Sequence, residues 1–275
     1  MIVDFHMHTL YSDGGLSVDD IITEANKNEV SFISITDHNT YLTYRRRNIK
    51  NIKYITGMEV DVNYKNITLH MLLYNFNLKS KLLNRYYKNN RRYEIRCFRK
   101  MIRELLDKYD INLDTNRVNK FIKNNNYFDR VRLNNLLVEC GICDNARNAY
   151  YSYTKNIKSH KRKSISIKEL FRLEKDSKGI VSLAHPLRYG VDLKSIETII
   201  IELKEKYNLR VVEAINNRQN LEEEKQLLEF CKNNALFISA GSDTHYKIGS
   251  NDTKEVGIIN NRKVEDSEVT FLNLI

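Results

Sequence analysis

Short strand-like runs alternate with helix-like runs at both ends of this 275-residue chain, and this alternation limits the possible folds more than any other feature. At the N-terminal end, residues 2–8 and 31–36 have the pattern of strands, and residues 17–28 have the pattern of a helix whose Ser17 and Asp20 form a start like a capping box. Strands that are joined through helices form parallel sheets or barrels with the helices outside. The sequence therefore predicts an α/β fold.

The alternation is interrupted in the middle of the chain and returns after residue 165. Residues 77–165 have helical periodicity instead, because apolar side chains recur there at steps of three to five residues, as in 93–109 and 133–140. We expect Gly141 to end the second of these helices. We therefore predict a discontinuous α/β domain, residues 1–76 with 166–275, and a helical insertion domain at 77–165. The expected elements of the second part are strands 180–185, 209–216 and 236–245 and helices 164–179, 193–207 and 220–234. We expect the first of these helices to be opened by Ser166 with Glu169 three residues on, and to be closed by Gly179.

The excess of basic residues is confined to this insertion. Residues 76–165 contain 22 Lys and Arg against 8 Asp and Glu, a net charge of +14, whereas the rest of the chain has a net charge of −4. Aromatic residues are interleaved with the basic ones in 84–103, which suits contact with a nucleic-acid backbone. A solvated face in a chain biased toward Lys and Asn is the alternative, although bias alone does not explain the segregation of charge.

Cysteine usage and hydropathy indicate a cytoplasmic protein that is not bound to a membrane. Four cysteines do not form a disulfide framework in a chain of this length, and they fit a reducing compartment. Cys140 and Cys143 form a C-x-x-C pair, but a zinc ribbon needs a second pair, so we expect them to pack at the end of a helix. We find no leader-like segment and no apolar run of about 18 residues.

Histidines and carboxylates gather at the predicted ends of strands. His6 and His8 share one face of the first strand because side chains alternate, and Asp13 follows them in a Ser-Asp-Gly turn. In parallel α/β folds, the carboxyl ends of the strands meet at one edge and carry the functional site. Such a cluster would be unfavourable without a cation, and His with Asp and Glu suits Zn, Mn or Fe. The other expected members are His38, Glu59, His70, His185, Asp243 and His245.

These residues fall within seven ordered motifs, which are HMH (6–8), SDG (12–14), TDH (36–38), GME (57–59), His70, AHP (184–186) and GSDTH (241–245). In order and spacing they resemble the polymerase-and-histidinol-phosphatase (PHP) superfamily over residues 2 to about 246. Residues 127–141 and 183–189 are most similar to its TrpH-type branch. Members of that branch act on nucleoside 3′,5′-bisphosphates and remove nucleotides from the 5′ ends of short RNAs.

The resemblance implies a distorted (β/α)7 barrel of the PHP type with three divalent metal ions, Mn, Fe or Zn, at its C-terminal edge. By motif, the first ion would be held by His6, His8, Glu59 and Asp243. The second would share Glu59 and add His70 and His185, and the third would be held by Asp13, His38 and His245. Asp37, which precedes His38, would orient an imidazole. Asp13, Glu59 and Asp243 would be catalytic as ligands of the ions.

Two arginines are expected to bind substrate phosphate. Arg130 matches an arginine that the branch keeps in its helical insertion, and we expect it to be catalytic as well as phosphate-binding. A guanidinium suits this role because it can contact two phosphate oxygens at once. Arg188, which follows the AHP motif, is the second candidate. Arg132 departs from the pattern of the branch, which commonly has a histidine at this position. This difference puts the substrate preference of the chain in question.

The sequence therefore predicts a cytoplasmic, metal-dependent phosphoesterase that acts on nucleotides or short single-stranded RNA, with no obligate protein partner. Water bound to such ions becomes a nucleophile near neutral pH and hydrolyses phosphate esters. Histidinol-phosphate phosphatase is one alternative, although a small substrate would not need the basic insertion. A non-catalytic metal-containing module that binds nucleic acid is another, although structural zinc sites are usually rich in cysteine.

Overall fold

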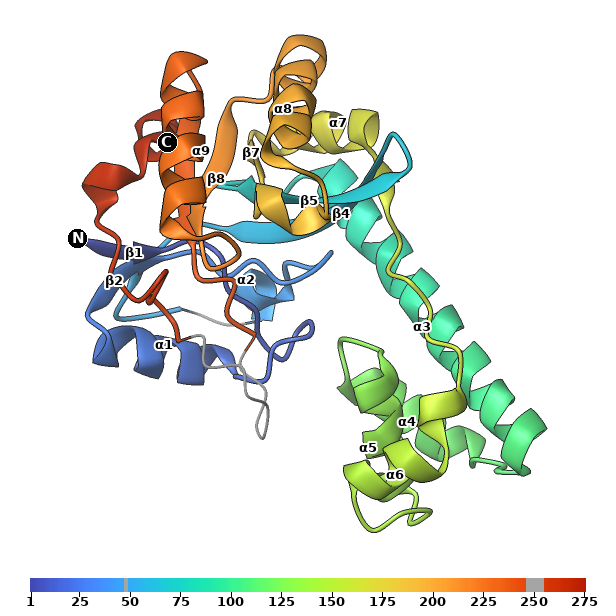
Figure 1. Ribbon diagram of the computed structural model, residues 1–275. Helices are drawn as coiled ribbons and strands as arrows, with labels where there is room; N and C mark the ends of the chain where they lie inside the picture. Colours follow the sequence, from blue (N-terminus) through green and yellow to red (C-terminus); the bar gives the residue numbers. More distant parts are fainter. Residues whose placement is uncertain (47–48, 246–254) are drawn as a thin grey trace. The chain divides into compact units, whose positions relative to one another are not determined.

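The structure, a computed structural model, describes residues 1–46, 49–245 and 255–275 (Figure 1). Contacts between residues divide the chain into two units. The first unit comprises residues 1–85 and 164–275, and the second comprises residues 86–163. The predicted insertion, 77–165, contains the second unit, and its exact limits stay a prediction.

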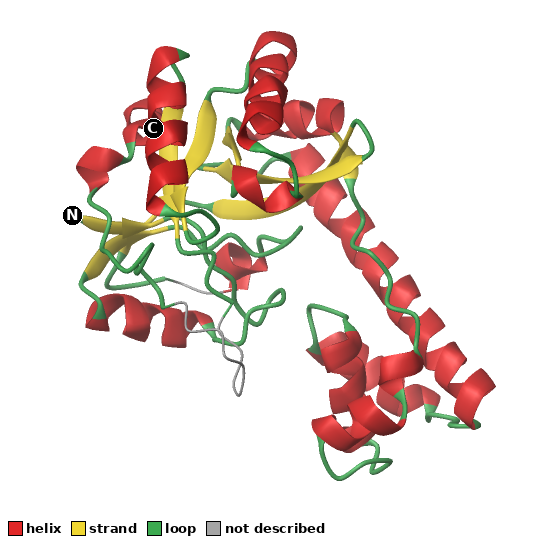
Figure 2. Ribbon diagram, in the orientation of Figure 1, coloured by secondary structure: helices red, strands yellow, loops and turns green. Residues whose placement is uncertain are grey.

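The first unit contains the alternating strands and helices (Figure 2). Its elements up to the second unit are β1 (Ile2–Asp4), α1 (Val18–Lys27), β2 (Val30–Ile33), α2 (Leu42–Arg46), β3 (Lys53–Tyr54), β4 (Gly57–Tyr64) and β5 (Ile67–Tyr74). Those that follow are β6 (Ile165–Ser166), α7 (Ile167–Ser177), β7 (Ile180–Leu183), α8 (Leu193–Tyr207), β8 (Val211–Asn216), α9 (Leu221–Asn233) and β9 (Phe237–Gly241). The described residues of this unit also form 3₁₀ helices at Pro186–Tyr189, Asp266–Glu268 and Thr270–Leu274.

Two sheets form the centre of this unit. One has the strand order β1-β2-β3 and the other has the order β6-β4-β5-β7-β8-β9. The pairs are parallel except for those that β5 makes with β4 and β7. Single bridges connect the two sheets, His38 with Glu59 on one side and Met7 with Thr244 on the other. The strands therefore follow a distorted barrel, which confirms the predicted α/β class.

Apolar side chains fill the space between the sheets, and one buried carboxylate connects β1 to the chain that follows β9. Phe5 packs edge-on against both Phe32 and Phe271, at ring-centroid distances of 5.0 and 5.2 Å. Asp4, at the end of β1, accepts hydrogen bonds from the backbone N–H groups of Ser242 and Gly257 at 2.9 and 2.8 Å. Because these bonds tie β1 to the chain that follows β9, they fix the strand ends on which the site is built.

The helix boundaries follow from local capping chemistry. Ser17 and Asp20 form a capping box at the start of α1, and Ser166 and Glu169 form another at the start of α7. Both starts agree with the sequence prediction. The end of α7 differs, because Lys178 and not Gly179 takes the left-handed conformation, with φ of 54°. Gly179 is needed for space, since a Cβ there would lie 2.8 Å from Leu73 Cδ1.

Gly241 ends β9 directly beside His6, and this close approach gives a stability prediction. A Cβ at Gly241 would lie 2.2 Å from His6 Cβ and 2.6 Å from its backbone nitrogen. We expect Gly241→Ala to lower the free energy of unfolding by about 1–3 kcal/mol or more, measured by urea denaturation of chelator-treated protein. Gly141→Ala is the control, because Gly141 has open space and only a positive φ of 74°. Equal losses in the two variants would contradict the argument.

The second unit is helical, as predicted. It contains most of α3 (Lys81–Tyr109), then α4 (Thr115–Asn124), α5 (Arg130–Glu139), α6 (Ala146–Ser152) and a 3₁₀ turn at Thr154–Asn156. Phe98 lies between Phe121 and Phe128, and Leu133 and Leu137 of α5 pack in the same cluster. Gly141, at φ 74°, follows the end of α5 as expected. This unit therefore has its own apolar core.

Within the described part of the chain, none of the helices combines the length and the hydropathy needed to span a bilayer.

Candidate metal centre

The nine predicted ligand residues meet at one edge of the barrel. His6 and His8 follow β1, His38 follows β2, His185 follows β7, and Asp243 and His245 follow β9. Two of these side chains stand on unusual backbone, since φ is 24° at His185 and 53° at Asp243. Left-handed backbone at residues other than glycine is costly and concentrates at functional sites. The strand ends and these two turns direct the side chains toward one another.

Glu59 lies near the amino end of β4, and His70 is a second residue that does not lie at the carboxyl end of a strand. It lies in the middle of β5, opposite Asp61 of β4. The reason is that β5 runs antiparallel to both β4 and β7, so the edge that carries the site does not coincide with its carboxyl end. Its side chain still joins the cluster, because its Nδ1 lies 2.8 Å from Glu59 Oε1.

The donor atoms form overlapping groups in which all members lie within 4.8 Å of one another. All nine predicted residues belong to at least one group, and Asp61 is an additional member that the sequence prediction missed. The groups are His8, Asp13, His38 and His245; His6, His185 and Asp243; His6, His8 and Glu59; His38, Asp61 and His70; and Glu59, His70 and His185.

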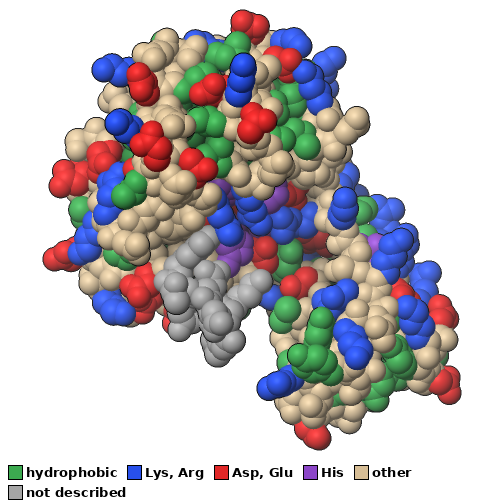
Figure 3. Space-filling model, in the orientation of Figure 1, with side chains coloured by type: hydrophobic (Ala, Val, Ile, Leu, Met, Phe, Trp, Pro, Cys, Tyr) green, Lys and Arg blue, Asp and Glu red, His purple; other side chains and the backbone are tan. Residues whose placement is uncertain are grey.

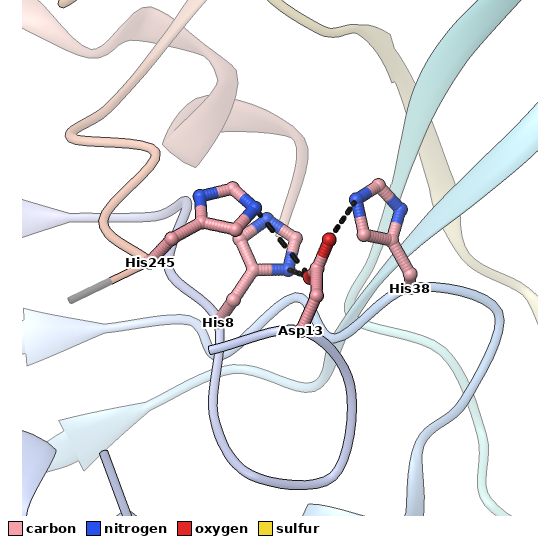
Figure 4. Close-up of side chains that lie close together, drawn as sticks. All are labelled: His8, Asp13, His38 and His245. Carbon is pink, nitrogen blue, oxygen red and sulfur yellow. Dashed lines mark ion pairs between the residues drawn. The ribbon is translucent and has the colours of Figure 1, made fainter. Parts of the chain in front are cut away.

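Asp13 lies among three imidazoles (Figure 4). Its Oδ1 is 3.6 Å from His8 Nδ1 and 3.5 Å from His245 Nε2, and its Oδ2 is 3.7 Å from His38 Nε2. These distances are longer than ordinary hydrogen bonds between an imidazole and a carboxylate. Because all four side chains point to a common centre, they surround a space in which one cation could contact each of them.

Glu59 is fully buried at the centre of the cluster, and its two oxygens face different histidines. Oε1 lies 2.8 Å from His70 Nδ1 and 2.9 Å from His185 Nε2. Oε2 lies 3.1–3.5 Å from the Nε2 atoms of His6, His8 and His38, yet it accepts no hydrogen bond. A buried carboxylate oxygen without a hydrogen bond is costly, and a bound cation would remove that cost.

Carboxylates behind the imidazoles fix their orientation. Glu213 of β8 lies 2.8 Å from His6 Nδ1, which turns Nε2 toward the centre, and its other oxygen accepts the backbone N–H of His185. Asp61 Oδ1 lies 3.3 Å from His70 Nε2. Such outer partners tune metal ligands. Two signals could have found them: an acidic residue within an apolar strand for Glu213, and the two-residue spacing from Glu59 for Asp61.

Asp37 reaches an imidazole through Ser12, whose Oγ donates to Asp37 and lies 3.4 Å from His8 Nδ1, and its predicted orienting role stays a prediction. Its carboxylate accepts hydrogen bonds from the backbone and hydroxyl of Thr9, both at 2.8 Å, and from the hydroxyls of Ser12 and Thr43, both at 2.7 Å. Because these bonds hold the loop that leads to Asp13, Asp37 positions that ligand candidate through the backbone.

The electrostatics of the cluster favour cations. Burial alone would raise the pKa of Glu59, but His38, His70 and His6 outweigh it and hold the pKa well below its usual range. The pKa values of Asp13 and Asp243 are likewise held well below their usual range by the facing histidines, against the effect of burial. Burial lowers the pKa of His185 to about 4, so this imidazole is neutral near pH 7 and can coordinate without first losing a proton.

Two guanidinium groups stand at the rim of the cluster. Figure 3 shows histidine side chains at the surface of the first unit with Lys or Arg side chains beside them. Arg188, the predicted phosphate-binding residue, is 3.9 Å from Asp243 Oδ2 and its side chain is 38% exposed. Arg218, which sequence analysis missed, donates to the same oxygen from Nε and Nη2, both at 3.0 Å. Its position after β8 was the signal that could have found it.

Arg130 and Arg132 belong to the second unit. Arg130 begins α5, and its Nη2 donates to the carbonyl oxygen of Ile157 at 2.9 Å, while its Nε is buried without a hydrogen bond. Arg132 lies 3.9 Å from Asp129 Oδ1 and 5.5 Å from the ring centre of Tyr127. The role of Arg130 in substrate binding stays a prediction.

The cysteines take no part in the cluster. Cys97 and Cys231 are buried, and Cys140 and Cys143 are half-buried, all four as free thiols. Cys140 and Cys143 pack against the apolar core of the second unit, as predicted, and burial raises the pKa of both thiols. Raised pKa values disfavour the thiolate, which is the form that binds metal.

Comparison with known proteins identifies the family. The PHP domain family matches residues 4–210. The chain belongs to the PHP domain family. With the buried His, Asp and Glu donors described above, this makes the protein a metal-dependent phosphoesterase that uses divalent ions.

Curated relatives and solved structures agree with this membership. The chain is 24% identical over 258 residues to 5′-3′ exoribonuclease Rnm of Escherichia coli strain K12, covering 89% of this chain and 85% of the relative. It is 24% identical over 253 residues to a 5′-3′ exoribonuclease of Haemophilus influenzae, covering 90% of each. An amidohydrolase structure from Chromobacterium violaceum has a TM-score of 0.69 at 20% identity, covering 100% of this chain and 95% of that one.

A second solved structure, a candidate metal-dependent phosphoesterase from Bifidobacterium adolescentis, has a TM-score of 0.68 at 19% identity. It covers 97% of this chain and 93% of that one. At these identities, the two structures establish the fold alone.

Proposed function

We propose that the protein hydrolyses phosphate esters of nucleotides or short RNA, as a nucleoside 3′,5′-bisphosphate phosphatase and 5′-3′ exonuclease with three metal ions. The observation that carries the proposal is the convergence of nine His, Asp and Glu side chains, with the buried Glu59 at their centre. Bound divalent ions would supply a nucleophilic water near neutral pH and neutralise charge on phosphate oxygens.

The nine side chains divide among the ions as their motifs suggest. Asp13, His38 and His245 would hold one ion. Glu59 suits a bridging role between the other two, because Oε1 faces His70 and His185 while Oε2 faces His6 and His8. Asp243 would complete the group of His6 and His8, since its Oδ1 is 3.5 Å from the Nε2 atom of each.

Arginine side chains would bind the substrate phosphate. Arg188 is partly exposed at the rim, so an incoming phosphate can reach its guanidinium. Arg130, on the second unit, is the other arginine proposed to bind phosphate, and its buried Nε has no hydrogen-bond partner. In this role the guanidinium groups orient the ester and attract its negative charge.

RNA is the substrate class that the charge of the second unit favours. Residues 86–163 contain 19 Lys and Arg against 8 Asp and Glu, whereas the cluster itself is built of His and carboxylates. Basic surfaces bind nucleic acid through phosphate contacts, with strong dependence on salt. The curated relatives named as exoribonucleases point the same way.

A substrate panel tests the proposal. Manganese-loaded protein is incubated with nucleoside 3′,5′-bisphosphates, 5′-phosphorylated RNA and DNA oligonucleotides, and histidinol phosphate, and mononucleotides are resolved from inorganic phosphate. We expect mononucleotides to leave RNA stepwise from the 5′ end and phosphate to leave the bisphosphates. Faster turnover of histidinol phosphate would favour the alternative phosphatase, and absence of any product would favour the binding module.

A further inference from the structure

We propose that Arg218 is a positioning residue that makes Asp243 a metal ligand through one oxygen only. The inference rests on the metal centre of the proposed function. It concerns how this chain holds one of the ligands, and it gives Arg218 a function separate from binding of substrate.

The two oxygens of Asp243 have different surroundings. The side chain is fully buried, and Oδ1 lies 3.5 Å from each of three imidazole nitrogens, His6 Nε2, His8 Nε2 and His245 Nδ1. Oδ2 receives two hydrogen bonds from Arg218, both at 3.0 Å. Because Arg218 occupies Oδ2 from the outer side, Oδ1 is the oxygen that faces the ligand cluster.

The backbone around Arg218 is fixed by the loop that carries Asp243. The Asn217 amide donates from Nδ2 to the carbonyl oxygen of Ser242, at 2.9 Å, so the residues that precede the two side chains are connected directly. The Arg218 N–H also donates to Asn216 Oδ1 at 2.8 Å. On the other side, the Asp243 N–H donates to the carbonyl oxygen of His6 at 2.8 Å. Both backbones are therefore held, and the side-chain hydrogen bonds fix the remaining rotation of the carboxylate.

Arg188 lies near the same carboxylate oxygen as Arg218 and serves as a comparison for it. Its Nη1 lies 3.9 Å from Asp243 Oδ2, which is beyond hydrogen-bond distance, and its side chain is 38% exposed. Both arginines place positive charge near Asp243, but of the two only Arg218 donates hydrogen bonds to its carboxylate. A substitution of Arg188 therefore removes charge without releasing the carboxylate.

Two effects of Arg218 on a bound ion oppose each other. Its positive charge repels a cation, so removing the charge alone would strengthen metal binding. Its hydrogen bonds hold the ligand oxygen in place, and loss of such an outer partner typically weakens metal affinity about 10- to 100-fold. We expect the second effect to dominate, because the guanidinium is one-third exposed and solvent screens its charge, whereas the hydrogen bonds reach a buried oxygen.

The test compares Arg218→Gln, Arg218→Lys and Arg188→Gln with the unchanged protein. Manganese affinity is measured by titration of the metal alone into chelator-treated protein, and KM and kcat are measured on a nucleoside 3′,5′-bisphosphate. We expect Arg218→Gln to weaken the affinity of one manganese ion about 10- to 100-fold. The manganese affinity of Arg218→Lys should lie between those of the unchanged protein and Arg218→Gln, since lysine keeps the charge and one hydrogen-bond donor. Arg188→Gln should leave manganese affinity unchanged and raise KM.

Unchanged or tighter manganese binding in Arg218→Gln would overturn the proposal, and so would a rise in KM alone, which would make Arg218 a substrate-binding residue. Circular dichroism and thermal unfolding of each chelated variant exclude loss of the fold as the cause of weaker binding. If the unchanged protein bound manganese but hydrolysed none of the esters, the proposed function would fail while the role of Arg218 in metal binding could still be measured.

Discussion

Replacing Asp243 with asparagine should lower the rate of phosphoester hydrolysis about 10²- to 10³-fold or more while leaving the fold intact. Asparagine has nearly the same shape and tolerates the left-handed backbone that Asp243 adopts, at φ 53°. Asparagine lacks the negative charge of the carboxylate, which three imidazoles and Arg218 surround in the structure. The change therefore removes a ligand charge with little change in packing.

Asp110→Asn is a matched control for this variant. Asp110 has nearly the same φ, 54°, but is exposed and belongs to the second unit, outside the donor cluster. Initial rates on a 5′-phosphorylated RNA, metal content and thermal unfolding are measured for both variants. Full activity of Asp243→Asn with a normal complement of metal would refute the role assigned to Asp243.

Much of the site could be predicted because its residues follow strands in short motifs. His6 and His8 follow β1, which ends at Asp4 and is shorter than the predicted strand 2–8, but they flank Met7, which forms a single β-bridge with Thr244. Alternation of side chains around Met7 therefore still places the two histidines on the same face. Asp243 and His245 likewise lie two residues apart, directly after the end of β9. Capping boxes such as that of Ser166 with Glu169 also depend on local sequence alone, so the helix starts agreed with the structure.

The residues that sequence analysis missed act across distant parts of the chain. Glu213 reaches His6 from a strand 207 residues away, and Arg218 meets Asp243 from a different loop. Neither contact has a local pattern, because each depends on which strands become neighbours. His70 was misplaced for a related reason, since the antiparallel direction of β5 cannot be read from the residues of that strand.

Removal of divalent metal should abolish hydrolysis and also destabilise the protein. Without a cation, the cluster keeps Glu59 Oε2 buried with no hydrogen bond, and most of the imidazoles and carboxylates around it are buried as well. A ligand that binds the folded state at 100 times its dissociation constant adds about 2.7 kcal/mol to the free energy of unfolding. We therefore expect chelated protein to unfold at a lower temperature and to recover its stability when manganese is added.

The most direct test of the account follows one RNA oligonucleotide through removal and return of metal. Protein is treated with a chelator, dialysed, divided, and assayed with and without added manganese, while mononucleotide products and the unfolding temperature are recorded on the same samples. We predict no product without metal, stepwise release of 5′ mononucleotides after manganese is returned, and a matching rise in the unfolding temperature. Equal product release by metal-free and manganese-loaded protein would contradict the assignment of this cluster as the catalytic metal centre.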